Sequence, residues 1–245
     1  MIEPQYLTGL NGKEQFSRKE LLESFRLGGY SLSDASFYKR IEEFVRQGEL
    51  VRVGRNVYRI PAGKVTAYEH TYSELAEEIA NKMSAQYPYL SYSIFELVQL
   101  NDFVNHQIAH NVIYLSVEAE AIDFVFDMLK EYHPGKVLIN PSVELYHQYW
   151  SDNMIVIEKL TTEAPKGHKV PWHTRLEKML VDLLSDSLIL ASVGESEYAT
   201  IYQDAFTRYI IDEKALFRYA NRRKVDKKIL KLIKEETDIK LYTRG

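Results

Sequence analysis

Residues 17–60 decide the fold of the first part of the chain, and they read SRKELLESFRLGGYSLSDASFYKRIEEFVRQGELVRVGRNVYRI. The stretch begins with Ser17 and has Glu20 three positions later, which is the capping-box pattern of a helix start. Apolar residues then recur at helical spacing, and two glycines at positions 28 and 29 stop the pattern. We therefore predict a first helix that ends at these glycines.

A second helix is predicted from about Asp34 to Gln47, followed by a β-hairpin. Four apolar residues fall on one helical face: Phe37, Ile41, Phe44 and Val45. Two short alternating segments, 49–53 and 57–60, follow and are joined by the turn Gly54-Arg55-Asn56. The order helix, turn, helix and hairpin predicts a winged helix-turn-helix domain over residues 1–61.

Double-stranded DNA is the expected ligand of this domain. The major groove is about 12 Å wide and admits one helix, while the preceding helix braces it across the backbone. The second helix presents its polar side to the groove, and the hairpin presents cations, among them Arg59. The residues that we predict to bind DNA are Ser17, Arg18, Ser36, Tyr38, Lys39, Arg40, Arg52, Arg55 and Asn56. The carboxylates at positions 42, 43 and 49 repel phosphates, which leaves a protein-binding domain of the same fold as the alternative.

Beyond residue 61 the sequence predicts a small α/β domain over residues 62–160. Apolar runs at 111–117, 136–140 and 154–158 predict strands. Helical patterns at 72–83 and 118–132 alternate with them, as in an α/β unit. A further helix is expected to begin within residues 93–99.

Residues 161–245 are predicted to form a C-terminal helical region. Two prolines and a glycine predict a loop over 161–171, and apolar stripes predict helices beyond it. Asp226 is expected to cap the last helix. The chain as a whole is therefore expected to be α+β, with three consecutive domains.

The formal net charge of −4 hides an uneven distribution along the chain. Residues 1–61 hold ten Lys and Arg against eight Asp and Glu, whereas residues 62–160 hold five against fourteen. Residues 161–245 hold sixteen against thirteen. Local charge sets the affinity for phosphate, so the acidic middle does not argue against DNA binding by the first domain.

Signals for catalysis and for cofactors are weak in this sequence. The chain has no cysteine, and His106 and His110, which share a face if they lie on a helix, have no third ligand in a metal-binding motif. Glu158 and Lys159 are adjacent, so in a strand they point to opposite faces, unlike the Glu-x-Lys of Mg²⁺-dependent nucleases. We expect a protein that is not an enzyme and holds no metal or cofactor, with a degenerate nuclease-like fold as a further alternative.

Localisation is expected to be cytoplasmic. The first five residues lack the basic and apolar regions of a secretory signal, and no apolar run approaches the roughly 18 residues that span a bilayer. We therefore expect no membrane partner.

Several segments resemble a known family. FSRKEL at 16–21 and RQGELVRVGRNVYRI at 46–60 are similar to the winged helix of AbiEi-type abortive-infection antitoxins. LNDF at 100–103, NPS at 140–142, IVIEKL at 155–160, LEKMLVDL at 176–183 and LFRYA at 216–220 resemble uncharacterised proteins that are usually grouped beside these antitoxins. The resemblance extends over nearly the full length.

This resemblance implies a transcriptional regulator that represses its own promoter and counters a nucleotidyltransferase toxin encoded beside it. Such type IV systems do not require a stable complex of toxin and antitoxin. The basic residues Arg222, Arg223 and Lys227 are a candidate partner-binding surface, with a plain solvated face as the alternative. Dimerisation on paired DNA half-sites is an expectation that no sequence element supports directly.

Overall fold

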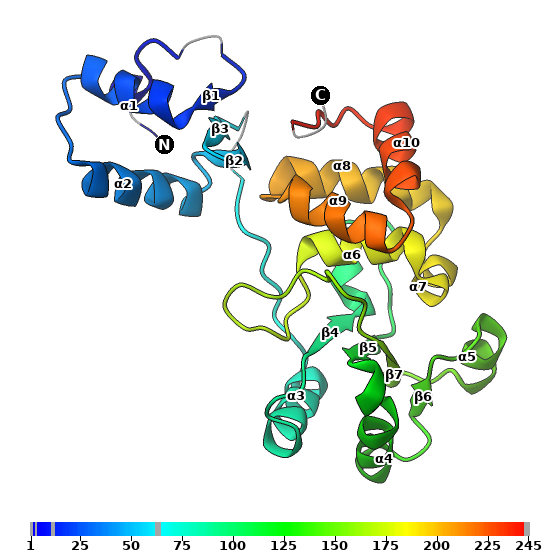
Figure 1. The fold of residues 1–245 in the computed structure, drawn as a ribbon. Coiled ribbons are helices and arrows are strands. Elements are labelled where there is room, and N and C mark those ends of the chain that lie inside the picture. The colour runs from blue at the N-terminus through cyan, green and yellow to red at the C-terminus, as the bar shows by residue number, and fades with distance from the viewer. Residues whose placement is uncertain (1, 3, 11–12, 62–64, 243–245) are drawn as a thin grey trace. The chain divides into compact units, whose positions relative to one another are not determined.

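The structure, a computed structural model, describes residues 2, 4–10, 13–61 and 65–242 (Figure 1). These residues form a mixed α+β structure with two separate sheets, which confirms the predicted class at that level. The chain forms two compact units. Unit 1 consists of Met1–Tyr68, Ala205–Lys214 and Lys240–Gly245, and unit 2 consists of Glu69–Asp204 and Ala215–Ile239.

These units differ from the three consecutive domains expected from the sequence. The boundary expected at 61 lies near the observed one at 68, but no boundary falls at 160. The α/β segment and most of the C-terminal helices share one unit, because the sheet has two faces and the later helices cover one of them. Within the described part of the chain, no helix combines the length and apolar composition needed to cross a membrane.

In its described residues, the first 68 positions of unit 1 form one short 3-10 helix, two α-helices and a three-stranded antiparallel sheet. Its elements are η1 (Pro4–Leu7), β1 (Phe16–Ser17), α1 (Arg18–Leu27), α2 (Asp34–Arg46), β2 (Val51–Gly54) and β3 (Val57–Arg59), and the strand order is β1-β3-β2. Both helices and the hairpin lie where the sequence predicts them, whereas β1 and η1 were not predicted. The short strand β1 forms because Phe16 pairs with Tyr58 across the sheet.

The core of unit 1 is rich in aromatic residues. Phe25 of α1 meets Phe37 of α2 edge-on, with ring centroids 5.4 Å apart. Tyr6 of η1 stacks on Tyr30 at 4.3 Å and approaches Phe25 at 4.6 Å. Aromatic pairs of this kind add roughly 0.5–1.5 kcal/mol beyond their buried area. The N-terminal segment is thus an integral part of the unit.

Two later segments of the chain complete unit 1 at the hairpin. The backbone N–H of Thr66 donates to the carbonyl of Arg208 at 3.2 Å, and that of Ile210 donates to Thr66 at 2.9 Å. A small apolar cluster joins these segments to the strands: Val51, Val53 and Val65, with Val57, Ile210 and Tyr242 packed against them. The hairpin is therefore supported by residues from distant parts of the sequence.

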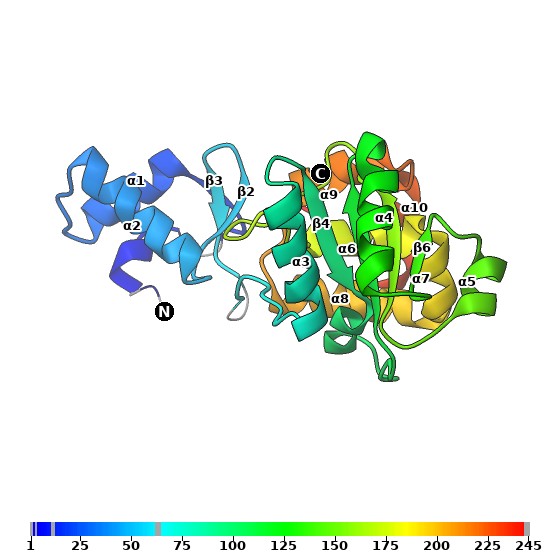
Figure 2. The ribbon, with the colours of Figure 1, turned by 90° about the horizontal axis from the view of Figure 1, so that it is seen from below.

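Unit 2 is built on a four-stranded sheet of order β4-β5-β7-β6 (Figure 2). The strands are β4 (Tyr92–Glu96), β5 (Val112–Val117), β6 (Val137–Ile139) and β7 (Met154–Lys159). Strand β4 pairs antiparallel with β5, whereas β5 and β6 each pair parallel with β7. Parallel pairing requires crossover connections, which α4 and α5 supply.

Helices cover both faces of this sheet (Figures 1 and 2). One face packs on α3 (Glu74–Gln86) and α4 (Ile122–Tyr132), through side chains such as Met83, Leu129, Ile113 and Ile157. The opposite face carries the C-terminal helices α6 (Leu176–Ser185), α7 (Ser187–Ser192), α8 (Tyr198–Arg208), α9 (Glu213–Arg222) and α10 (Asp226–Glu236). The remaining elements are α5 (Val143–Tyr149), η2 (Leu97–Asp102), η3 (Ala119–Ala121) and η4 (Glu195–Glu197).

Three local features of unit 2 differ at least in part from the expectations. The helix expected to begin within 93–99 is the 3-10 helix η2, which starts at Leu97, whereas residues 93–96 belong to strand β4 and pair with β5. The helix α5 was not predicted, since its seven residues are too few to show a clear period. Asp226 is the first residue of α10 and not its cap: the cap position is Val225, with no side-chain hydrogen bond.

Candidate nucleic-acid interface

The start of α1 holds the first predicted DNA-binding residues. The Ser17 hydroxyl accepts a hydrogen bond from the Glu20 N–H at 3.2 Å, and the Glu20 carboxylate accepts one from the Ser17 N–H at 2.7 Å. The predicted capping box is therefore present. The Ser17 hydroxyl already accepts a hydrogen bond within the protein, so the first role of this side chain is to cap the helix.

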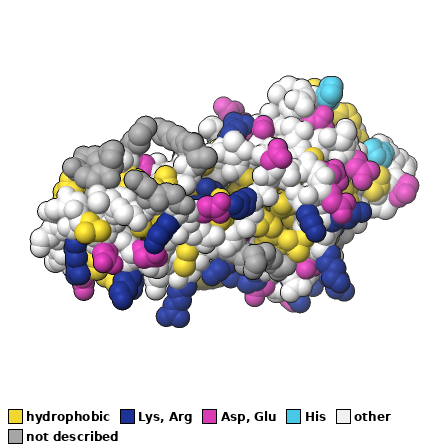
Figure 3. Space-filling view, turned by 90° about the horizontal axis from the view of Figure 1, so that it is seen from above, with side chains coloured by type: hydrophobic (Ala, Val, Ile, Leu, Met, Phe, Trp, Pro, Cys, Tyr) yellow, Lys and Arg dark blue, Asp and Glu magenta, His cyan; other side chains and the backbone are white. Residues whose placement is uncertain are grey.

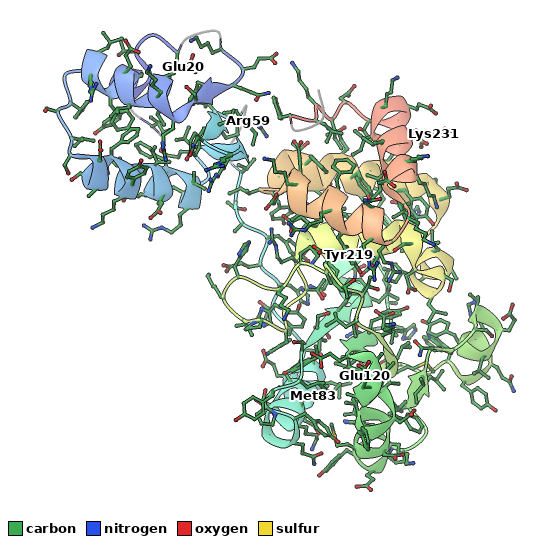
Figure 4. The ribbon with its side chains drawn as sticks, in the orientation of Figure 1. Glu20, Arg59, Met83, Glu120, Tyr219 and Lys231 are labelled. Atoms are coloured by element: carbon green, nitrogen blue, oxygen red, sulfur yellow. The ribbon has the colours of Figure 1, made fainter. Side chains whose placement is uncertain are left out.

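Glu20 carries a negative charge at this helix start, and that charge is compensated locally (Figure 4). The Lys13 ammonium donates to the carboxylate at 2.6 Å. This hydrogen bond and those from Ser17 lower the pKa of Glu20 to about 2. The neutralised pair reduces the repulsion that a phosphate would otherwise meet at this end of α1.

Arg18 joins the helices and the hairpin at one point. Its backbone N–H donates to the carbonyl of Asn56 at the hairpin tip, at 2.8 Å. Its guanidinium lies over the ring of Tyr38 on α2, 4.9 Å from the centroid. Three of the predicted residues from distant positions in the sequence are thus brought together. The spacing of these residues along the sequence did not predict that they meet.

The hairpin tip is the tight turn that the sequence predicts. Asn56 has a φ of +60°, in the left-handed region that asparagine tolerates better than most residues. Arg55 precedes it and is exposed, without an ion-pair partner in the described ranges. Arg52 is also exposed, and its Nε donates to the carbonyl of Gly54 at 3.3 Å. The hairpin therefore displays two arginines at and beside a short, defined turn.

The outer side of α2 presents a smaller basic surface than predicted. Ser36 and Lys39 are exposed, and the Ser36 hydroxyl lies 3.0 Å from that of Ser33, the helix cap. Arg46 is exposed on the same helical side as Lys39, two turns further along, and was not among the predicted DNA-binding residues. Arg46 follows Lys39 by seven residues, so helical periodicity was the signal that could have found it.

Two of the cations considered for DNA binding, Arg40 and Arg59, already have partners within the protein. Arg40 donates to the Glu43 carboxylate at 3.0 Å and to the Tyr6 hydroxyl at 3.3 Å. Its guanidinium also lies near the ring of Phe44. Arg59 lies over the Tyr242 ring at 4.6 Å, with its Nε buried (Figure 4). Periodicity did not reveal Tyr6 and Tyr242 as partners, because they come from η1 and from the C-terminal segment.

The histidine pair singled out in the sequence does not share a helix face, because residues 103–110 are not helical. His106 Nδ1 lies 3.2 Å from Glu197, and His110 Nδ1 lies 3.7 Å from Asp152. Among the residues that the structure describes, no group of three or more histidine or acidic side chains is placed to hold a metal ion.

Glu158 and Lys159 lie on opposite faces of β7, as their adjacency predicts. Lys159 is exposed, whereas the Glu158 carboxylate accepts a hydrogen bond from the Ser116 hydroxyl on β5 at 2.7 Å. Burial raises the pKa of Glu158 to about 7, although the ammonium of Lys178 lowers it. This carboxyl group belongs to a larger cluster that the sequence did not reveal.

That cluster, which we call the buried ion network, consists of Ser116, Glu158, Lys178, Asp182 and Tyr219. Lys178 and Asp182 on α6 are almost fully buried and form an ion pair of 2.7 Å. The Tyr219 hydroxyl donates to the Asp182 carboxylate at 2.8 Å (Figure 4). Burial by itself would lower the pKa of Lys178. The carboxylate of Asp182 and the other neighbours of Lys178 have a larger effect, so the pKa of Lys178 is raised.

The basic residues near the end of the chain divide into two kinds. Arg223 is half-buried, donates to Ser185 at 2.9 Å and lies 3.8 Å from Asp182. These contacts hold its guanidinium within the protein, and its place on a partner-binding surface stays a prediction. Arg222 and Lys227 are exposed.

Comparison with known proteins identifies one family whose model matches most of the chain. The model of a family of unknown function, DUF6577, matches residues 36–239. No curated protein matches the sequence. A crystal structure of the RV2827C protein from Mycobacterium tuberculosis is similar, with 13% identity over 95% of this chain and 71% of that chain, and a TM-score of 0.32.

Proposed function

Since the chain belongs to DUF6577, a family of unknown function, we propose its function from its own surface: unit 1 is a winged helix-turn-helix domain that binds double-stranded DNA. In this assignment α2 enters the major groove and the β2–β3 hairpin is the wing. The chain is then a transcriptional regulator that represses its own promoter.

The junction at Arg18 is the observation that carries this proposal. It fixes Tyr38 of α2 and Asn56 of the hairpin tip to the start of α1. Each of these residues is next in sequence to an exposed cation, Lys39 on the helix and Arg55 on the hairpin. A helix that reads bases and a wing that meets phosphates need this fixed relation, since both contacts must form in one register.

Binding to DNA from the chain's own upstream region tests this function. We expect saturable binding that weakens as salt rises, because phosphate contacts release counterions. Arg55→Ala and Lys39→Ala should each weaken binding roughly tenfold, within the 1–3 kcal/mol that one base contact contributes. Arg26→Ala is the matched control, because Arg26 is an exposed cation in the last turn of α1, at the other end from Arg18.

The same measurement separates DNA binding from the alternative. A folded sample that does not retain this DNA, or whose binding falls equally in Arg26→Ala and Arg55→Ala, contradicts the regulator. Absence of binding would favour a winged helix that contacts protein, for which the exposed Glu42 on the same helix as Lys39 is the supporting feature.

The proposal includes antitoxin activity against a nucleotidyltransferase toxin, and this part rests on the family resemblance of the sequence segments alone. Co-expression with a nucleotidyltransferase encoded beside the chain tests it. Growth should recover when the antitoxin is produced, and persistent toxicity in the presence of folded protein would contradict it.

A further inference from the structure

The turn between α9 and α10 carries a dense group of basic side chains in unit 2. We call Arg222, Lys224, Lys227, Lys228 and Lys231 the α9–α10 basic surface, and all five are exposed. Figure 4 shows Lys231 on the outer side of α10, and Figure 3 displays basic side chains in dark blue on the face seen from above. Within the stretch 222–231, the only opposing acid is Asp226.

Internal partners do not explain this surface. Arg218, one turn earlier on α9, pairs with Glu163 at 2.8 Å, and Arg223 is tied to α6 and its C-terminal end. In contrast, Arg222, Lys224, Lys227 and Lys228 form no ion pair with any residue that the structure describes, and Lys231 has only a loose one with Glu235 at 3.8 Å. The neighbouring cations Arg218 and Arg223 thus have close partners within the protein, whereas the five side chains of the α9–α10 basic surface are available to solvent or to a ligand.

Backbone geometry also argues against a purely structural role for Lys224. The helix α9 ends in a Schellman motif, in which the Val225 N–H donates to the Ala220 carbonyl and the Lys224 N–H to the Asn221 carbonyl. Lys224 occupies the left-handed position, with a φ of +60°. Glycine is the residue that fits this position without strain, so a lysine there costs stability.

The first turn of α10 places two more lysines where they do not help the fold. Lys227 and Lys228 follow Asp226 at the N-terminal end of the helix, where the helix dipole is positive and disfavours cations. Lys231 lies one turn beyond Lys227 on the same side, about 6 Å along the helix axis. Their positions are better explained by a ligand of opposite charge than by stability.

We propose that the α9–α10 basic surface binds the phosphate backbone of double-stranded nucleic acid without reading its sequence. Exposed lysines and arginines on a turn between helices suit an extended row of phosphates, to which the lysines bind as point charges. The surface lies entirely in unit 2, so this proposal stands whether or not unit 1 binds an operator.

Salt-dependent binding to a labelled DNA duplex of unrelated sequence tests the proposal. The variant Lys227→Gln with Lys231→Gln removes two charges and keeps helix-forming side chains. We expect weaker binding and a shallower slope of log affinity against log salt, by about 0.9 for each phosphate that the variant no longer neutralises. The matched control, Lys130→Gln with Lys159→Gln, removes the same charge from exposed positions on α4 and β7 of the same unit.

A second variant, Lys224→Gly, removes a charge from the surface without lowering stability, so weaker binding cannot be attributed to unfolding. It should bind the duplex more weakly while its melting temperature is no lower than that of the unmodified chain, because glycine relieves the left-handed strain.

Slopes equal to those of the control double variant would overturn the proposal. So would a Lys227→Gln, Lys231→Gln variant that keeps its affinity for the duplex but no longer binds vesicles of anionic lipid. In an Arg55→Ala background, which removes a proposed phosphate contact of the wing, the Lys227→Gln, Lys231→Gln change should lower the slope by the same amount as in the unmodified chain, so the two proposals fail separately.

Discussion

The two units treat charged residues in opposite ways. In unit 1 the cations Lys39 and Arg55 remain exposed on short elements, and Arg18 lies against an exposed ring. In unit 2 Lys178 and Asp182 are buried between the sheet and the C-terminal helices. A lysine on an amphipathic helix is therefore a surface feature in one unit and a core feature in the other. The difference comes from the layers that cover the helix and not from the residue itself.

Removal of one buried partner should produce the largest effect. Lys178→Met leaves the Asp182 carboxylate buried without its ammonium, which should lower the free energy of unfolding by roughly 3–5 kcal/mol. Urea unfolding of the full chain measures it. Lys159→Met in the same unit, at an exposed position, should change stability by no more than about 0.5 kcal/mol. Equal losses of stability in both variants would end the contrast between buried and exposed charge.

Unit 1 has one position where packing is as demanding as the buried ion network. A Cβ on Gly48 would lie 1.6 Å from the carbonyl oxygen of Val65, and Gly48 has a φ of +70°. Gly48→Ala should therefore cost about 3 kcal/mol, the upper range for overpacking. Gly29 has a similar φ of +86° with nothing within 4 Å, so Gly29→Ala should cost only about 1 kcal/mol of backbone strain.

Thermal unfolding of these two glycine variants separates the steric contact from the backbone conformation. A larger loss of stability in Gly48→Ala assigns the difference to Val65, which belongs to the apolar cluster at the hairpin. Similar losses in both variants would mean that unit 1 relaxes around this contact.

The pH dependence of stability should differ in sign between the units. The pKa of Glu158 is raised from 4.5 to about 7, so the fold favours its protonated form. Its contribution is fully present below pH 4.5 and is lost as pH rises through about 7. Glu158→Gln should remove this decline, because an amide keeps the contact with Ser116 without ionising. A decline that persists in the variant would assign it to other groups.

Glu20 provides the opposite case in unit 1. Its pKa is lowered to about 2 by the hydrogen bonds from Lys13 and Ser17, so its contribution is present above pH 4.5 and is lost as pH falls towards 2. Glu20→Gln should reduce acid sensitivity in this window, measured by unfolding at fixed urea across the pH series. The reverse trend would show that the capping box does not favour the carboxylate.

The smallest expected effect concerns the junction of Arg18 with Tyr38. A double-mutant cycle with Arg18→Ala and Tyr38→Leu should give a coupling energy of roughly 0.5–1 kcal/mol, as for an exposed cation–π contact. If the proposed function is correct, each single variant also weakens DNA binding by more than it lowers stability. A coupling of zero would leave the Arg18 side chain without a role in joining α1 to α2.

Local features of the fold followed from the sequence where short-range chemistry decides the backbone. The capping box at Ser17 is one such feature, and the hairpin turn at residues 54–56 is another. The strand β5 was also predicted, because its continuous apolar run suits a sheet covered on both faces. Residues 93–99 were predicted only in part: η2 does begin at Leu97, but pairing with β5 makes residues 93–96 a strand.

The candidate site was predictable only in part. The polar side of α2 and the arginines of the hairpin follow from periodicity, and Lys39 and Arg55 are exposed as expected. Arg40 contacts Tyr6 and Arg59 contacts Tyr242, and both tyrosines lie far away in the sequence. Periodicity identifies which side of an element is polar, but it contains no information about which distant segment covers that side.

The sequence by itself determined the order of most helices and strands, the tight turn of the hairpin and the uneven charge of the chain. Those properties depend on interactions within a few residues, such as capping, turn geometry and hydrophobic period. Tertiary structure alone decided that Lys178 and Asp182 are buried, that Arg223 is internal while Arg222 is exposed, and that Ile210 and Tyr242 support the hairpin. Burial depends on which elements pack together, and contacts between distant segments set that arrangement.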